Sequence, residues 1–125
     1  MKAVLVTGSR AWEDRKAIRE ALDAEKPTCV LVGDCPTGAD AITRQWCQAM
    51  GVPCSVFLAN WKSLGKKAGP MRNKAMVDGL AKFSDRVALA FPLGESPGTR
   101  GCIKLCEAAG VVVKVVEAVT PAGKL

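Results

Sequence analysis

The nine residues KAVLVTGSR (residues 2–10) decide the fold, because a short apolar run is broken there by a glycine and a hydroxyl residue. A continuous apolar run of this length is typical of a strand covered on both faces, as in a parallel sheet. The same pattern returns four times, at residues 28–32 (TCVLV), 54–59 (CSVFLA), 86–91 (RVALAF) and 111–116 (VVVKVV). The sequence therefore predicts five buried strands.

Segments with helical patterns separate these strands. Asp14 is the expected N-cap of the first helix, and Thr37 with Asp40 resembles a capping box before the second. Gly69-Pro70 starts the third, because the missing N–H of a proline is harmless early in a helix. The predicted helices cover residues 15–25, 38 to about 50, 69–80 and, after a loop at 92–99, up to about 109. Strands that alternate with helices predict an α/β domain with a mainly parallel five-stranded sheet.

Length and charge limit the possible classes of protein. The chain has 125 residues, of which 49% are apolar, and 18 Lys+Arg against 12 Asp+Glu give a net charge of +6. We expect one domain at residues 1–118 and a flexible C-terminal tail at residues 119–125. No apolar run approaches the roughly 18 residues of a membrane helix, and no signal peptide is evident. A cytoplasmic protein without a membrane partner is expected.

The chain contains no histidine and no tyrosine. A Ser-His-Asp triad, a Cys-His dyad and the common zinc and iron sites that need imidazole are therefore excluded. Six cysteines are present without a CxxC spacing, so we expect reduced thiols, no metal site and no cofactor. Cys29 and Cys54 lie in strand-like runs and Cys102 and Cys106 share one helix face, which indicates core positions.

Three loops at one edge of the predicted sheet have an unusual composition. Residues 7–12, 33–40 and 92–99 each follow a strand and combine glycine with a hydroxyl residue before a helix. Ligands of parallel α/β sheets bind at the carboxyl ends of the strands, and helix N-termini favour anions. Neither GxGxxG after the first strand nor GxxxxGK[ST] is present, which argues against a dinucleotide dehydrogenase and a P-loop NTPase.

A basic segment begins at the same edge. Residues 60–77 hold five cations and no acid, which is +5 of the net +6. A solvated basic face and a phosphate site are both open interpretations, and the position favours the second. Arg72, near a helix start, is placed to point a planar fork at phosphate. Trp12 and Trp61 either stack on a base or cover the sheet.

These motifs resemble the SLOG superfamily, the Rossmann-like group that includes the LOG phosphoribohydrolases and the DNA-processing protein DprA. Within it they are similar to the small single-domain YspA/YpsA-related branch, over about residues 2–116. The matching motifs are VTGSRAWED (6–14), TGAD (37–40), ANWKSLGKKAGPMRNKAM (59–76) and AFP…PGT (90–99). The resemblance implies a Rossmann-like three-layer domain with a pocket for a nucleotide or a nucleotide-derived ligand. Small relatives are often encoded by phages, and dimers are common among them, so a homo-oligomer is expected.

The resemblance also implies site residues. Carried over by motif, the ligand-binding residues are Gly8, Ser9, Arg10, Gly38, Asp40, Arg72, Asn73, Gly98 and Thr99. The composition of the loops and the basic segment adds Trp12, Gly33, Asp34, Trp61 and Lys66.

Catalysis is left open by one substitution. LOG enzymes carry PGGxGTxxE at the loop after the fourth strand, and its glutamate helps to cleave an N-glycosidic bond. Here Cys102 stands in place of that glutamate. The catalytic residues are therefore unknown, with the carboxylates Asp34, Asp40 and Glu95 as candidates. The first hypothesis is a nucleotide-binding sensor or sequesterer of an ADP-ribose-like or cyclic-nucleotide ligand. The alternatives are an N-glycosidic hydrolase of nucleoside monophosphates and, third, DprA-like nucleic-acid binding.

Overall fold

A five-stranded sheet forms the centre of the molecule, which we describe from a computed structural model. The structure describes residues 1–118, so the tail predicted at residues 119–125 lies outside the described residues. The strands are β1 (Lys2–Gly8), β2 (Cys29–Gly33), β3 (Cys54–Phe57), β4 (Asp85–Phe91) and β5 (Val113–Val115). The helices are α1 (Arg15–Glu25), α2 (Gly38–Met50), α3 (Trp61–Leu64), α4 (Ala68–Leu80) and α5 (Pro97–Ala108), with a 3-10 helix η1 (Gly65–Lys67) before α4.

All strand pairs are parallel, and the strand order is β3-β2-β1-β4-β5. The chain winds outward from β1 to β3 and then returns to the other side of β1 with β4. The strand order therefore reverses between β1 and β4, which is the point where ligands bind in open α/β sheets. The predicted α/β class with a parallel five-stranded sheet is confirmed.

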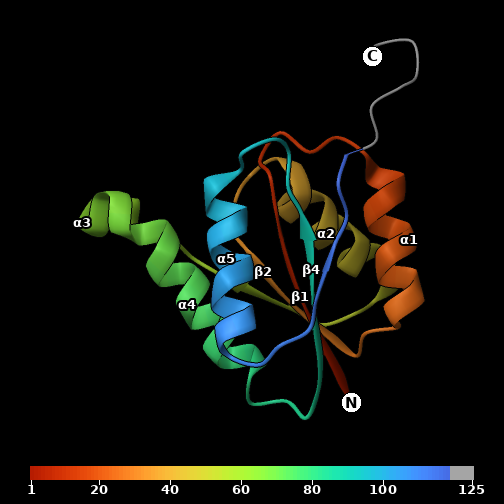
Figure 1. The fold of residues 1–125 in the computed structure, drawn as a ribbon. Helices are drawn as coiled ribbons and strands as arrows, with labels where there is room; N and C mark the ends of the chain where they lie inside the picture. The colour runs from red at the N-terminus through yellow and green to blue at the C-terminus, as the bar shows by residue number, and fades with distance from the viewer. Residues whose placement is uncertain (119–125) are drawn as a thin grey trace.

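Helices cover both faces of the sheet, with α1 and α2 on one face and α4 and α5 on the other (Figure 1). Successive residues of a strand point to opposite faces. Val4 and Val6 accordingly pack in the cluster under α1 and α2, whereas Ala3 and Leu5 pack under α4 and α5. All four are fully buried, which explains the uninterrupted apolar run at the start of the chain.

The four cysteines predicted at core positions differ in how deeply they are buried. Cys102 and Cys106 of α5 are fully buried in the cluster under α4 and α5. Cys29 and Cys54 are partly buried and pack against the two core clusters at their margins. All six cysteines are free thiols.

Local signals at two helix starts have different outcomes. Asp14 caps α1 as predicted, since its Oδ1 accepts a hydrogen bond from the N–H of Ala17 at 3.1 Å. The capping box predicted at Thr37 and Asp40 is wrong. The Thr37 hydroxyl donates to the carbonyl oxygen of Arg10 at 2.9 Å, and Asp40 accepts from the N–H of Cys35 at 3.3 Å. A contact with the β1–α1 loop and a contact within the β2–α2 segment replace the local cap.

The stretch at residues 60–68 contains α3 and η1. Asn60 begins α3, because its Oδ1 accepts a hydrogen bond from the N–H of Ser63 at 3.2 Å. These short helices lie at the outer end of α4, away from the sheet (Figure 1). They place Trp61 beside the first turn of α4, next to Gly69.

Within residues 1–118, no helix combines the length and the apolar character needed to cross a membrane. Over the same residues, no group of three or more Cys, Asp or Glu side chains is arranged to hold a metal ion.

Candidate functional site

A cavity of about 710 Å³ opens at the carboxyl edge of the sheet. The end of β1 and the loop after β4 border it on the two sides of the reversal in strand order. The β2–α2 loop, the start of α2, and α3, α4 and α5 complete it. Its volume lies in the range of about 300–1,000 Å³ typical of small-ligand sites. Nine of the predicted site residues line it, namely Gly8, Ser9, Arg10, Asp40, Trp61, Arg72, Asn73, Gly98 and Thr99.

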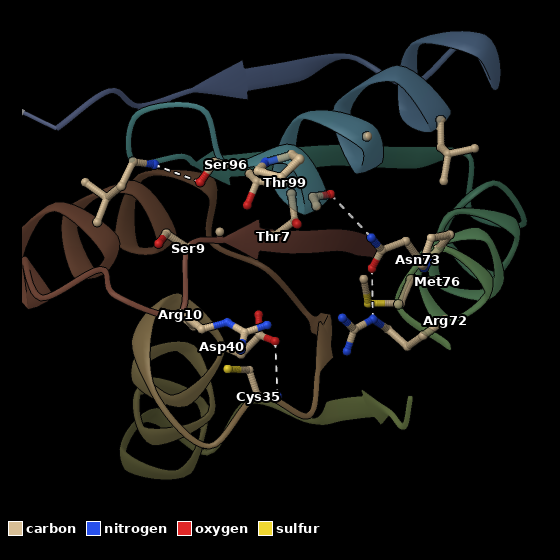
Figure 2. A pocket seen from close by; sticks show the side chains of 18 of the residues that line it. Thr7, Ser9, Arg10, Cys35, Asp40, Arg72, Asn73, Met76, Ser96 and Thr99 are labelled. Atoms are coloured by element: carbon tan, nitrogen blue, oxygen red, sulfur yellow. Dashed lines mark hydrogen bonds between the residues drawn. The ribbon is translucent and has the colours of Figure 1, made fainter. Parts of the chain in front are cut away.

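One side of the cavity is rich in hydroxyl groups, and we call Thr7, Ser9, Ser96 and Thr99 the hydroxyl wall (Figure 2). Thr99 lies in the first turn of α5, whose N-terminal N–H groups lack partners in the preceding turn. Ser96 stands just before this helix in a left-handed conformation, and its Oγ accepts from the N–H of Leu93 at 3.0 Å. Hydroxyl groups beside a helix N-terminus form a favourable environment for an anion.

The backbone around Ser9 keeps three segments together. The N–H of Ser9 donates to the carbonyl of Phe91 at 3.0 Å, and the Ser9 carbonyl accepts from the N–H of Ala39 at 3.1 Å. Gly38 has a φ of +70°, and a Cβ atom there would overlap the Ser9 carbonyl oxygen. The β1–α1 and β2–α2 loops can therefore meet only with glycine at this position.

The opposite side of the cavity carries Asp40 and Arg72, which we call the charged wall (Figure 2). Arg72 is held by two partners: its Nη1 lies 2.9 Å from Asp34 Oδ1, and its Nε donates to Asn73 Oδ1 at 2.8 Å. Arg72 therefore lines the cavity, as its predicted role at a phosphate site requires, with two of its five N–H donors engaged within the protein. Asp34 also accepts from the N–H of Ala59 at 3.2 Å, which fixes the carboxylate that holds Arg72.

Asp40 is only 7% exposed. Burial raises the pKa of Asp40 above its ordinary value, although Arg72, the N–H of Cys35 and Arg44 act in the opposite direction. Gly33 makes room for this arrangement, because a Cβ atom there would lie 2.5 Å from Arg72 Nη1 and 2.6 Å from Asp40 Oδ2. Asp40 can accept hydrogen bonds from a ligand, and it is a carboxylate with a perturbed pKa inside a cavity.

Asn73 connects the two walls, and apolar side chains form the rest of the cavity surface. Asn73 accepts from Arg72 on one side and donates to the Gly98 carbonyl on the other, at 3.4 Å. Apolar side chains supply the remaining surface, and Trp61 at the rim is 53% exposed. The apolar lining residues are Trp61, Pro70, Met76, Leu93, Pro97 and Leu105. The cavity thus combines polar groups for orientation with apolar surface for contact area.

Several predicted residues lie outside the cavity. Trp12, predicted either to stack on a base or to cover the sheet, does not line the cavity: it is 3% exposed and its ring packs edge-on against Phe91, with centroids 5.3 Å apart. Its Nε1 donates to the Asp14 carbonyl at 2.9 Å, so it has the alternative role of covering the sheet. Gly33, Asp34 and Gly38 support lining residues from behind, whereas Lys66 is exposed on η1.

The three catalytic candidates lie in different environments. Asp40 lines the cavity, Asp34 is paired with Arg72, and Glu95 is exposed outside the lining. Cys102, in place of the family glutamate, is fully buried beneath the cavity and does not line it. A hydrogen bond from Cys106, together with Thr7 and Arg72, lowers the pKa of Cys102 despite burial.

The sequence interpretation missed part of the lining. Cys35, Ser96 and Thr7 belong to the three glycine loops and could have been included on that ground. Met76 and Leu105 reach the cavity because α4 and α5 pack side by side on one face of the sheet. A helical pattern indicates only that such residues face inward, and not that they meet at a cavity.

Comparisons with known proteins agree with this architecture. The family model described as the YspA, cpYpsA-related SLOG family (YAcAr) matches residues 2–63. The chain is also 40% identical over 122 residues to the Gene 61 protein of Mycobacterium phage D29, which covers 90% of this chain and 94% of the phage protein. The matched family segment contains β1, β2 and the two loops that meet at Gly38.

Proposed function

This chain belongs to the YspA/cpYpsA-related SLOG family, and from that premise we propose that it binds a nucleotide or a nucleotide-derived ligand, of the ADP-ribose or cyclic-nucleotide class, as a sensor or sequesterer. Membership of the family suggests nucleotide-related binding or processing. The specific ligand class and the binding role are our proposal.

The observation that carries the proposal is the division of one cavity into a hydroxyl wall, a charged wall and an apolar surface. A phosphate group is favoured at the hydroxyl wall, where Ser9 and Thr99 stand beside the N-terminus of α5. The base is favoured against the apolar residues, with Trp61 at the rim as a stacking surface. Asp40 is an acceptor for ribose hydroxyl groups, the role that an acidic residue has in many Rossmann-type sites.

Isothermal titration calorimetry with AMP, ADP-ribose and 3′,5′-cyclic AMP tests this proposal. We expect at least one of them to bind, and we expect Thr99→Val to weaken binding by about tenfold or more, because a hydrogen bond to a charged group is lost. Ser84→Ala is the matched control, since Ser84 is exposed just before β4, at the opposite edge of the sheet. Absence of binding, or equal affinities of wild type and Thr99→Val, would contradict the proposal.

An N-glycosidic hydrolase is the second candidate, favoured by one observation. Among the described residues, Asp40 is the one carboxylate that lines the cavity, and it lies near Arg72. Chromatographic detection of free base from nucleoside monophosphates tests for this activity. Release that is lost in Asp40→Asn supports hydrolysis, whereas release at the rate of a protein-free control excludes it. Cys102 stands where LOG enzymes carry their glutamate, and it is fully buried. The chain therefore has no carboxylate at this position, which favours binding over hydrolysis.

Nucleic-acid binding is the third candidate. Lys62, Lys66 and Lys67 are exposed on α3 and η1, the segment that carries Trp61. A basic segment of this kind attracts nucleic acid without selecting sequence. A gel shift with a single-stranded oligonucleotide at physiological salt tests it, and we expect no retarded band if the cavity ligand is a small molecule.

A further inference from the structure

Arg72 lies close to two carboxylates, Asp34 and Asp40. Asp34 binds its Nη1 at 2.9 Å, and a Cβ atom at Gly33 would lie 2.5 Å from the same Nη1 and 2.6 Å from Asp40 Oδ2. Arg72 is also the largest of the influences that oppose the raised pKa of Asp40. The positive charge of Arg72 is therefore already compensated before any ligand arrives.

Two of the five N–H donors of Arg72 are engaged as well. Nε donates to Asn73 and Nη1 donates to Asp34, so two of the three guanidinium nitrogens have partners. A two-point grip on phosphate needs a pair of adjacent nitrogens. No pair of adjacent nitrogens is left with all of its N–H groups free, and the side chain is only 14% exposed.

From these contacts we propose that Asp34 is a specificity-determining residue, which reserves the charged wall for an uncharged, hydroxyl-bearing part of the ligand. This assignment rests on the proposed nucleotide site and narrows its ligands to nucleotides whose ribose has free 2′ and 3′ hydroxyl groups, which favours the ADP-ribose class over 3′,5′-cyclic nucleotides. A ribose with free 2′ and 3′ hydroxyl groups donates to Asp40. A ribose that carries a phosphate at either position brings a second anion against a buried carboxylate, beside an Arg72 whose charge is already paired with Asp34.

The division of charge across the cavity gives the ligand one orientation. Ser9 and Thr99 of the hydroxyl wall stand beside the N-terminus of α5, whereas the exposed side chain of Arg10 lines the cavity on the side of Asp40 (Figure 2). A 5′-phosphate is thus accommodated at the hydroxyl wall, while the ribose edge faces Asp40. Asp34 does not line the cavity and therefore does not contact the ligand. It influences which ligand binds through its ion pair with Arg72.

The experiment compares AMP with adenosine 2′,5′-bisphosphate and adenosine 3′,5′-bisphosphate by calorimetry on the full chain. We expect the wild type to bind AMP about tenfold or more tightly than either bisphosphate. Asp34→Asn removes the charge and keeps an oxygen acceptor, so we expect it to reduce this preference by about tenfold, through tighter binding of the bisphosphates. The gain should shrink as salt rises, since it comes from a released cation.

Two further variants separate this effect from a loss of structure. Asp34→Ser provides a second route to the same change if Asp34→Asn is poorly folded. Asp34→Asn combined with Arg72→Gln should return the bisphosphate affinities to wild-type values, because the released cation is gone. An unchanged preference in both Asp34 variants, with AMP still bound, would overturn this inference alone. Failure of the wild type to bind any of the three ligands would overturn the proposed adenine-nucleotide site and this inference with it.

Discussion

Gly38 and Ser9 are packed so closely that a Cβ atom at Gly38 would overlap the carbonyl oxygen of Ser9. This contact joins the β1–α1 loop to the β2–α2 loop directly beside the cavity. Gly51, at the other end of α2, has nearly the same backbone conformation, with φ of +69° against +70°, but no atom lies within 4 Å of its position for a Cβ. The two glycines therefore separate the effect of conformation from the effect of contact.

Gly38→Ala should destabilise the protein much more than Gly51→Ala. Both substitutions force a left-handed residue, which costs about 1–2 kcal/mol. Only the change at Gly38 also displaces the neighbouring loop, so we expect a total loss of about 3 kcal/mol or more in the free energy of unfolding. Urea unfolding of both variants measures the difference, and equal losses would show that the loops can separate freely.

How far the sequence predicts the fold and the site depends on the range of the contacts involved. The run at residues 2–7 predicts β1 correctly, because burial of Ala3 to Val6 on both faces leaves a purely apolar pattern. The residue types of Thr37 and Asp40 fit a local cap, but the Thr37 hydroxyl bonds Arg10 of another loop and Asp40 bonds the backbone of Cys35. Pairing of Asp34 with Arg72 spans 38 positions and depends on where α4 lies beside β2, which no local pattern contains.

Glu25 should make the free energy of unfolding depend on pH in the acidic range. It is 7% exposed and binds Lys2 at 2.8 Å and Lys114 at 2.7 Å. Burial alone raises the pKa of Glu25, but hydrogen bonds and charge from the two lysines outweigh it, so the pKa lies below its ordinary value of 4.5. A carboxyl with a lowered pKa in the folded state stabilises above the unfolded pKa, and this contribution disappears as pH falls through the folded pKa.

Glu25→Gln should therefore lower the free energy of unfolding by about 2 kcal/mol at neutral pH and by much less near pH 3, in urea titrations at both values. Glu20→Gln is the control, because Glu20 is exposed and 3.8 Å from Lys16. A pair of that kind contributes less than about 1 kcal/mol. A loss for Glu25→Gln that is the same at both pH values would contradict the assigned ion pairs.

Thr43→Val should stabilise the protein. The Thr43 hydroxyl is fully buried in α2 and has no hydrogen-bond partner among the described residues. Valine has nearly the same shape and removes an unsatisfied polar group, so we expect a gain of about 1 kcal/mol. Thr28→Val is the opposite control, since the Thr28 hydroxyl bonds both the N–H and the carbonyl of Lys2. Thermal melts should move upward for Thr43→Val and downward for Thr28→Val; a fall in both would mean that Thr43 has a partner.

Cys35 should report ligand binding through its reactivity. Cys35 is partly exposed and lines the cavity just after the end of β2. Cys29, also partly exposed, begins β2 at the opposite edge of the sheet. Cys47 is an internal standard for an inert thiol, because burial raises its pKa to about 12. Alkylation with iodoacetamide followed by peptide mass spectrometry should label Cys35 and Cys29 in the free protein. Saturating AMP should protect Cys35 and leave Cys29 unchanged, since only Cys35 lies where a bound nucleotide excludes the reagent. Equal labelling of Cys35 with AMP bound, as verified by calorimetry on the same sample, would place the nucleotide outside this cavity.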